Sequence, residues 1–487
     1  MQNNSSDCQK PRIAIIGGGV AGATAAVHLG ELGLNVVLME RGPSLVNGPP
    51  ICHLHAGGNL YREISQQQCL ELLRQSIETI RLYQHTVNKR PTVIATPIDE
   101  LGHPEVLLPR LQIIQQAYRQ LVLEDARNEV LGAPDEYYRL YQRDDLERLR
   151  QHTQPEFPSD TDEWLIPFAK HVDFERIQYP VIAVQEYGWS VFRLAATAML
   201  TLKQLPHCQL LTNSTLVDAK QHDGQWHLTY HDERAQSHTL VADYLVNACG
   251  YETGKLDDLT HNPCRRMVEF KAAYIARWSD ENSLWPEVIF HGPRGTPQGM
   301  AQLTPYADGV FQLHGMTKDI TLFQNGLTGS SAHSSQPLLP DSLQKKLTKG
   351  WSEAAVEERT RRAIDHVGRF IPDYSHALPA GKPLFGAQQI PGQDETLRAA
   401  DVSFSGSHYA RIEIVKGSSA LEAARKLVAY WRLAQDSSLK SIEQQHPVSL
   451  SLSGSMIEQV AIDLAQARGY PIELAKVVGC QIPSLSF

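Results

Sequence analysis

Residues 12–22 read RIAIIGGGVAG, and residues 35–40 read NVVLME. The apolar run at 12–16 is short and rich in isoleucine, which is typical of a buried strand. Three glycines then separate it from an alanine-rich stretch that favours a helix. A second apolar run follows and ends at Glu40. Strand, glycine turn, helix and strand in this order predict a β-α-β unit at the start of the chain.

The spacing Gly17-x-Gly19-x-x-Gly22 gives this unit a dinucleotide-binding character. Gly17 permits the tight turn, Gly19 lets backbone N–H groups approach a pyrophosphate, and Gly22 lets the helix pack closely on the strand. Glu40, 18 residues after Gly22, can accept hydrogen bonds from a ribose diol. Its negative charge disfavours a 2′-phosphate, which argues against NADP. We therefore predict a nucleotide site at the first turn.

Composition excludes several other classes of protein. The 487 residues carry 45 Lys and Arg against 54 Asp and Glu, a net charge of −9, which argues against nucleic acid as the main partner. The seven cysteines are scattered without a C-x-x-C pair. That pattern suggests neither a disulfide framework nor a zinc site, and a reducing compartment fits best.

The sequence has no stretch that reads as a membrane or export signal. Residues 1–12 lack a basic patch followed by an apolar stretch, and no run of 18 apolar residues occurs. We expect a cytoplasmic protein without an integral membrane segment, and peripheral membrane contact stays open. The amphipathic stretch at 455–465 is expected to dock on the protein's own body.

Four further segments resemble the D-amino-acid oxidase (DAO) superfamily of FAD-dependent oxidoreductases. The matching stretches are ICHLHAGGNLY at 51–61, QEYGWSVFR at 185–193, ADYLVNACG at 242–250 and IVKGSS at 414–419. Their order is most similar to the branch that includes L-2-hydroxyglutarate oxidase and malate:quinone oxidoreductase. The run before Gly417 departs from the usual glycine-rich pattern, as does the long helical stretch between 66 and 175.

The resemblance implies FAD as the cofactor and a two-unit α/β fold. We expect a discontinuous Rossmann-like FAD-binding domain and an α+β substrate domain that carries an antiparallel sheet. The expected FAD-binding segments are 10–65, 176–262 and 375–435. The expected substrate or cap segments are 66–175, with a helical insertion, and 263–374, and residues 436–487 form a C-terminal linker and helix.

The same resemblance places the candidate site residues. The expected cofactor contacts are Gly17, Gly19, Ala21, Gly22, Glu40, Arg41, His55, Ala56, Gly57, Asn247, Gly250, Lys416, Gly417 and Ser418. His55 is also the candidate general base, with His53 as the second choice, because imidazole titrates near neutrality. A covalent flavin link or a packing role remains open for either histidine.

An anionic substrate calls for a guanidinium or ammonium group in the pocket. Arg411 is the expected substrate-binding residue, and Arg62, Arg294 and Lys318 are alternatives. The predicted reaction is oxidation of a small 2-hydroxy or 2-amino acid by hydride transfer to flavin N5, with oxygen, a quinone or another acceptor taking the electrons. The alternatives are a flavin monooxygenase or halogenase, and a flavin-bound binding or assembly protein without turnover.

Overall fold

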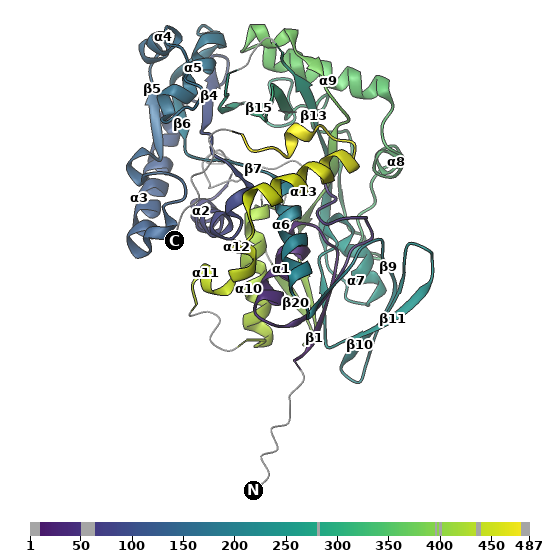
Figure 1. Ribbon diagram of the computed structural model, residues 1–487. Coiled ribbons are helices and arrows are strands. Elements are labelled where there is room, and N and C mark those ends of the chain that lie inside the picture. The colour runs from purple at the N-terminus through teal and green to yellow at the C-terminus, as the bar shows by residue number, and fades with distance from the viewer. Residues whose placement is uncertain are drawn as a thin grey trace.

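The computed structural model describes residues 10–49, 64–279, 283–394, 397–398, 402–434 and 440–478. Its nucleotide-binding half is built on a six-stranded sheet in the order β20-β21-β12-β1-β2-β8. All neighbouring strands in it pair in parallel except β20, which runs antiparallel to β21. The strands are β1 (Arg12–Ile16), β2 (Asn35–Met39), β8 (Cys208–Leu211), β12 (Tyr244–Asn247), β20 (Val402–Ser405) and β21 (Tyr409–Ile412) (Figure 1).

Both faces of this parallel sheet are buried, which explains its nearly continuous apolar strands. Ile13 and Ile15 point to the helical side, and Ala14 and Ile16 to the opposite side. The helical side is covered by α1 (Val20–Glu31), α6 (Val191–Gln204) and α10 (Ala420–Trp431). The opposite side is covered by α7 (Thr253–Leu259) and a three-stranded meander of β9 (Thr215–His222), β10 (Gln225–His231) and β11 (Ser237–Ala242).

The second half is a large, mainly antiparallel sheet in the order β17-β13-β16-β15-β14-β4-β6-β5, with β18 and β19 also paired to β13. β13 is its longest strand and connects to four others. The strands are β4 (Thr92–Pro97), β5 (Tyr138–Tyr141), β6 (Ile177–Val184), β13 (Arg266–Arg277), β14 (Glu287–Phe290), β15 (Ala301–Pro305), β16 (Val310–Gly315), β17 (Leu327–Gly329), β18 (Leu378–Pro379) and β19 (Leu384–Pro391).

The outer face of the large sheet packs on helices, and its inner face turns toward the nucleotide-binding half. Tyr274 and Val288 belong to the outer core, whereas Ile275 packs inward against α6. The outer helices are α4 (Arg143–Arg150), α5 (Thr161–His171) and α9 (Glu353–Gly368), while α8 (Asp341–Lys349) packs beside Val268 and Phe270.

The remaining helices pack around these two halves. They are α2 (Gln66–Leu82), α3 (Leu108–Glu124), α11 (Ile442–Gln445), α12 (Pro447–Leu450) and α13 (Gly454–Ala467), and a short β3–β7 pair joins Val87–Asn88 to Gly188–Trp189. Figure 1 shows α13 beside α6, and Ile457 and Ala461 pack there in one core with Phe192. The C-terminal helix therefore docks on the protein's own body, as expected.

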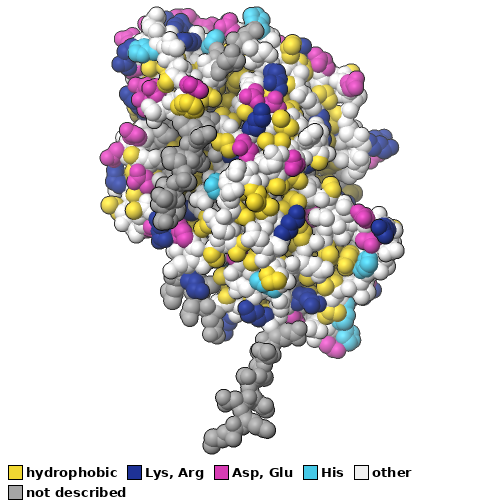
Figure 2. Space-filling model, viewed as in Figure 1, with side chains coloured by type: hydrophobic (Ala, Val, Ile, Leu, Met, Phe, Trp, Pro, Cys, Tyr) yellow, Lys and Arg dark blue, Asp and Glu magenta, His cyan; other side chains and the backbone are white. Residues whose placement is uncertain are grey.

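Figure 2 shows acidic and basic side chains interspersed over the face viewed.

The predicted α/β fold with a Rossmann-like domain and an antiparallel sheet is confirmed, but the segments divide differently. β6 and β19 were expected in the nucleotide-binding part, yet both pair with strands of the large sheet. α2 was expected in the cap, yet it packs against α10. Residues 66–150, which read as mostly helical, also contain β4 and β5. β4 is buried at every position and so shows no strand alternation. Among the described residues, no helix is long and apolar enough to cross a bilayer.

Candidate functional site

The glycine turn after β1 has the steric requirements that its spacing predicts. Gly17 has φ +102°, and a Cβ there would lie 2.3 Å from the carbonyl oxygen of Ala248. A Cβ at Gly22 would lie 1.9 Å from the carbonyl oxygen of Gly17. By contrast, a Cβ at Gly19 would meet nothing within 4 Å. A side chain is therefore excluded at Gly17 and Gly22, whereas the space beside Gly19 is open. This space leaves room for a pyrophosphate at the N-terminus of α1.

The carboxylate of Glu40 folds back onto this turn. It accepts hydrogen bonds from the backbone N–H of Gly18 and of Gly42, both at 2.7 Å. Its neighbour Arg41 forms an ion pair with Glu252 at 2.6 Å, next to Gly250. Glu40 thus lies at the carboxyl end of β2 with its charge held against the glycine turn, where a ribose would pass. The side chain of Ala21 in α1 is buried in the hydrophobic core, so only its backbone can contact a ligand.

Asn247 organises the turn that follows β12. Its side-chain amide donates to the carbonyl of Thr253 at 2.9 Å and to the hydroxyl of Tyr409 at 2.8 Å, and its Oδ1 accepts from the N–H of Cys249. The side chain is fully buried. Asn247 therefore shapes this turn from within, while Gly250, at φ +59°, has open space where a Cβ would stand.

The last of the family-like segments, residues 414–419, is called the closing motif below. It lies where a short 3-10 turn, Gly417–Ser419, leads into α10. A Cβ at Gly417 would lie 2.4 Å from the ring of Trp189, so only glycine fits there without movement. The carbonyl of Ser418 accepts a hydrogen bond from the hydroxyl of Thr79 at 3.1 Å. Lys416 immediately precedes this turn. Residues 417 and 418 therefore contact β7 through Trp189 and α2 through Thr79.

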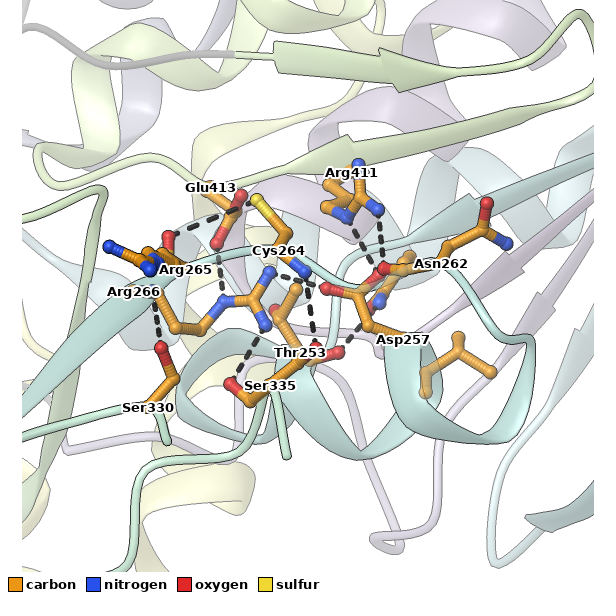
Figure 3. Close-up of polar contacts among 12 residues, drawn as sticks. Thr253, Asp257, Asn262, Cys264, Arg265, Arg266, Ser330, Ser335, Arg411 and Glu413 are labelled. Carbon is orange, nitrogen blue, oxygen red and sulfur yellow. Dashed lines mark hydrogen bonds and ion pairs between the residues drawn. The ribbon is translucent and has the colours of Figure 1, made fainter. Parts of the chain in front are cut away.

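Arg411 lies in a buried ion-pair network (Figure 3). Its Nε donates to Asp257 Oδ1 at 2.7 Å, and another guanidinium nitrogen donates to the carbonyl of Asn262. Asp257 also pairs with Arg266, whose Nε donates to Glu413 at 2.8 Å. Because Arg411 is already bound to these groups and is 4% exposed, its placement fits a structural role. We therefore do not assign the substrate carboxylate to it.

The segment expected to lie against the flavin falls outside the described residues. His55, Ala56 and Gly57 lie there, as do His53 and Arg62. The assignment of a general base to His55 therefore stays a prediction. Lys318 is described, and it is exposed near α9 on the outer side of the large sheet.

The inner face of the large sheet carries a group of charges, of which the sequence analysis named only Arg294 as a candidate. On β13, Lys271 lies 2.7 Å from Glu269, and Arg294 of the β14–β15 loop pairs with the same carboxylate. Lys271 donates to Gln388 Oε1 at 3.0 Å, and Gln388 donates to the carbonyl of Val415 at 2.9 Å. Lys271 is thus linked through Gln388 to the segment that leads into residues 414–419.

The placement of Lys271 has an electrostatic consequence. Burial lowers the pKa of the Lys271 ammonium, the carboxylate of Glu269 opposes this shift, and Arg294 and Arg398 strengthen it. Two cations sharing one carboxylate attract a further anion. Farther along the same face, Arg90 pairs with Glu287 at 2.6 Å with both side chains buried. The inner face therefore carries buried ion pairs beside the apolar contact that Ile275 makes with α6.

Comparison with known proteins identifies the family to which the chain belongs. The model of the family described as "FAD dependent oxidoreductase" (DAO) matches residues 12–392, more than half of the chain. A bifunctional tRNA 5-methylaminomethyl-2-thiouridine biosynthesis protein (MnmC) from Saccharophagus degradans is 53% identical over 49 residues, a match that spans 10% of this chain and 7% of that protein.

Two solved structures share the fold over most of the chain. Glycine oxidase from Geobacillus kaustophilus superposes with a TM-score of 0.54 at 13% identity, covering 88% of this chain and 96% of that one. Glycerol-3-phosphate dehydrogenase from Bacillus halodurans, solved with FAD, gives a TM-score of 0.54 at 13% identity and covers 94% and 72%. With its open glycine turn, its acidic residue after β2 and this family match, the chain belongs to the DAO family of FAD-dependent oxidoreductases.

Proposed function

We propose that the protein oxidises a small 2-amino or 2-hydroxy acid and that Lys271 and Arg294 bind the substrate's carboxylate. The observation that carries this proposal is the cationic pair on the inner face of the large sheet, joined through Gln388 to Val415. A carboxylate bound there would present its neighbouring carbon to the space between the two halves. Bound FAD supplies the acceptor for the hydride from that carbon.

The residues of the chain have separate tasks in this proposal. Lys271 and Arg294 fix the orientation of the acid by charge-assisted hydrogen bonds. Glu269 holds both cations in place and limits their net charge to one. The heteroatom proton of the substrate goes to a base, for which His55 remains our candidate on the resemblance given above. The names of the two structural neighbours, glycine oxidase and glycerol-3-phosphate dehydrogenase, both denote a small molecule that carries an anionic group, which supports a substrate with a carboxylate here.

An anaerobic titration of the purified flavoprotein tests the proposal. A panel of 2-amino and 2-hydroxy acids is added, each paired with its uncharged carboxamide, and bleaching of the oxidised-flavin absorbance is followed. We expect an acid to bleach the flavin and its amide to bind about tenfold to 100-fold more weakly, because the amide loses a charged hydrogen bond. Lys271→Met should weaken binding of the acid by a similar factor, with little effect on the amide.

The matched control is Lys318→Met, which removes a lysine on the outer side of the large sheet. It should leave both titrations unchanged. Equal reduction by acid and amide would contradict the carboxylate site, as would a Lys271→Met variant with unchanged affinity for the acid. A flavin that no acid in the panel reduces would contradict the proposed substrate class.

A further inference from the structure

The C-terminal segment, which lies outside the residues matched by the family model, contacts the loop that follows β2. Arg468 follows the last turn of α13 and reaches across to this loop. Its guanidinium donates to the carbonyls of Val46 at 3.0 Å, Asn47 at 3.0 Å and Gly48 at 2.6 Å. One side chain therefore satisfies three successive backbone acceptors in a segment more than 400 residues away in sequence.

Among the described residues, no carboxylate forms an ion pair with Arg468, and its hydrogen bonds go to backbone carbonyls. Its guanidinium lies over the ring of Phe192, 4.9 Å from the centroid, and burial lowers its pKa. A half-buried guanidinium whose donors go to backbone carbonyls is a specific clamp, since a planar group with several donors matches several acceptors at once.

The loop that Arg468 holds is strained at its centre. Val46 is buried and has φ +53°, a left-handed conformation in which a β-branched side chain is rare. Such a conformation costs energy and persists only where neighbouring contacts fix it. The carbonyl of Val46 is bound by Arg468, and its N–H donates to the carbonyl of Gly18 at 2.7 Å. Val46 thus connects the C-terminal clamp to the glycine turn.

A second link joins the same loop to the acidic residue of the site. Asn47 accepts a hydrogen bond from Ser44 at 2.8 Å, and its amide lies 3.4 Å from Glu40 Oε1. Leu45 packs closely against Gly18, and a Cβ added at Gly18 would lie 2.6 Å from the leucine side chain. The position of residues 44–48 is therefore coupled to Gly18 and Glu40, the backbone and carboxylate that border the open part of the turn.

We propose that Arg468 is a positioning residue for the FAD site: by clamping the carbonyls of residues 46–48 it keeps Val46 strained and Gly18 and Glu40 in their binding arrangement. The contact is to the side of the turn that faces the adenosine diphosphate half of a dinucleotide. Loss of the clamp should therefore weaken FAD and ADP by the same factor.

The test is equilibrium FAD release from the full-length holoprotein, measured by the fluorescence of free flavin after dilution, for Arg468→Met and Arg468→Lys. We expect Arg468→Met to bind FAD about tenfold to 100-fold more weakly, since it loses hydrogen bonds from a charged donor. Arg468→Lys should lie in between, because one ammonium can reach fewer of the three carbonyls. Displacement by ADP should show the same ratio of FAD to ADP affinity in all variants.

Two further variants separate positioning from general destabilisation. Arg277→Met breaks the ion pair to Glu473, five residues after Arg468 in the same C-terminal segment, and it should leave FAD affinity within about twofold. Val46→Gly removes the cost of the left-handed conformation. In that background Arg468→Met should lose much less affinity, because a glycine needs no clamp to keep this φ.

Several results would overturn the proposal. They are unchanged FAD affinity in Arg468→Met, an equal loss in Arg277→Met, and a loss of the same size in the Val46→Gly background. If Arg468→Met does not fold, Arg468→Lys carries the test alone. An affinity equal to that of the wild-type protein in both Val46 backgrounds would then refute the clamp.

Discussion

Replacing Asp257 by asparagine should destabilise the protein by about 3–5 kcal/mol. Asp257 is fully buried and accepts hydrogen bonds from Arg266, from Arg411 at 2.7 Å and from the hydroxyl of Tyr409 at 2.7 Å. With Glu413, it balances the two buried guanidinium groups. Asp257→Asn removes one negative charge without changing the volume, so the cluster retains a surplus positive charge that water cannot reach (Figure 3).

Urea unfolding followed by far-UV circular dichroism measures this loss. With a slope of about 3 kcal/mol per molar urea, the midpoint should fall by about 1–2 M. The matched control is Asp218→Asn on the exposed meander, where the carboxylate pairs with the exposed Lys220 at 2.7 Å, and it should change stability by less than about 0.5 kcal/mol. The double variant Asp257→Asn with Arg411→Met restores neutrality and should recover part of the stability.

The reasoning would be refuted if Asp257→Asn moved the midpoint no more than the control does. It would also fail if the added Arg411→Met substitution lowered stability by the same amount in both backgrounds. Either result would mean that the charge balance of the cluster does not contribute to the stability of the native fold.

Two further predictions concern the first helix. Gly22→Ala should abolish stoichiometric FAD in the purified protein, because its Cβ would lie 1.9 Å from the carbonyl oxygen of Gly17; flavin content per chain measures this, and normal content would contradict it. Burial, with the charges of His446 and Arg425, lowers the pKa of His28, so the unfolded chain takes up a proton near pH 6.5 that the folded chain refuses. Stability should therefore fall by up to about 1.4 kcal/mol per pH unit below about pH 6.5, and His28→Gln should flatten this slope in urea titrations from pH 7.5 to 5.

The sequence was most informative where function depends on a few neighbouring residues. Gly17, Gly19 and Gly22 act within one turn, and the backbone conformation that each requires is visible in the spacing alone. The tight turn at Asp223-Gly224 is similar, since an Asp-Gly pair between two strands favours a hairpin in which both residues adopt positive φ, as they do here. In each case the physical reason lies within a few residues of the motif.

The proposed carboxylate site could be predicted only in part: Arg294 was among the alternatives named from the sequence, whereas Lys271 was not, because the contacts of this site are long-range. Arg294 meets Glu269 across 25 residues, and Lys271 meets Gln388 across 117. Arg411 shows the same limit: a cation just before a cofactor motif indicates an anion nearby, and in the structure Arg411 pairs with Asp257, 154 residues earlier. Nothing in the local pattern distinguishes a buried partner carboxylate from a substrate carboxylate.

These long-range contacts have a common location. Arg266 begins β13 of the large sheet, and its partners Asp257 and Glu413 belong to the nucleotide-binding half. Arg468 likewise connects the C-terminal segment to the loop after β2. Cofactor turn and cationic pair lie on different halves, so their relative position depends on how firmly these halves are joined. Buried ion pairs are suited to this task because they tolerate few alternative arrangements, even where apolar residues would give equal stability. These buried ion pairs therefore fix the position of the proposed carboxylate site relative to the cofactor turn.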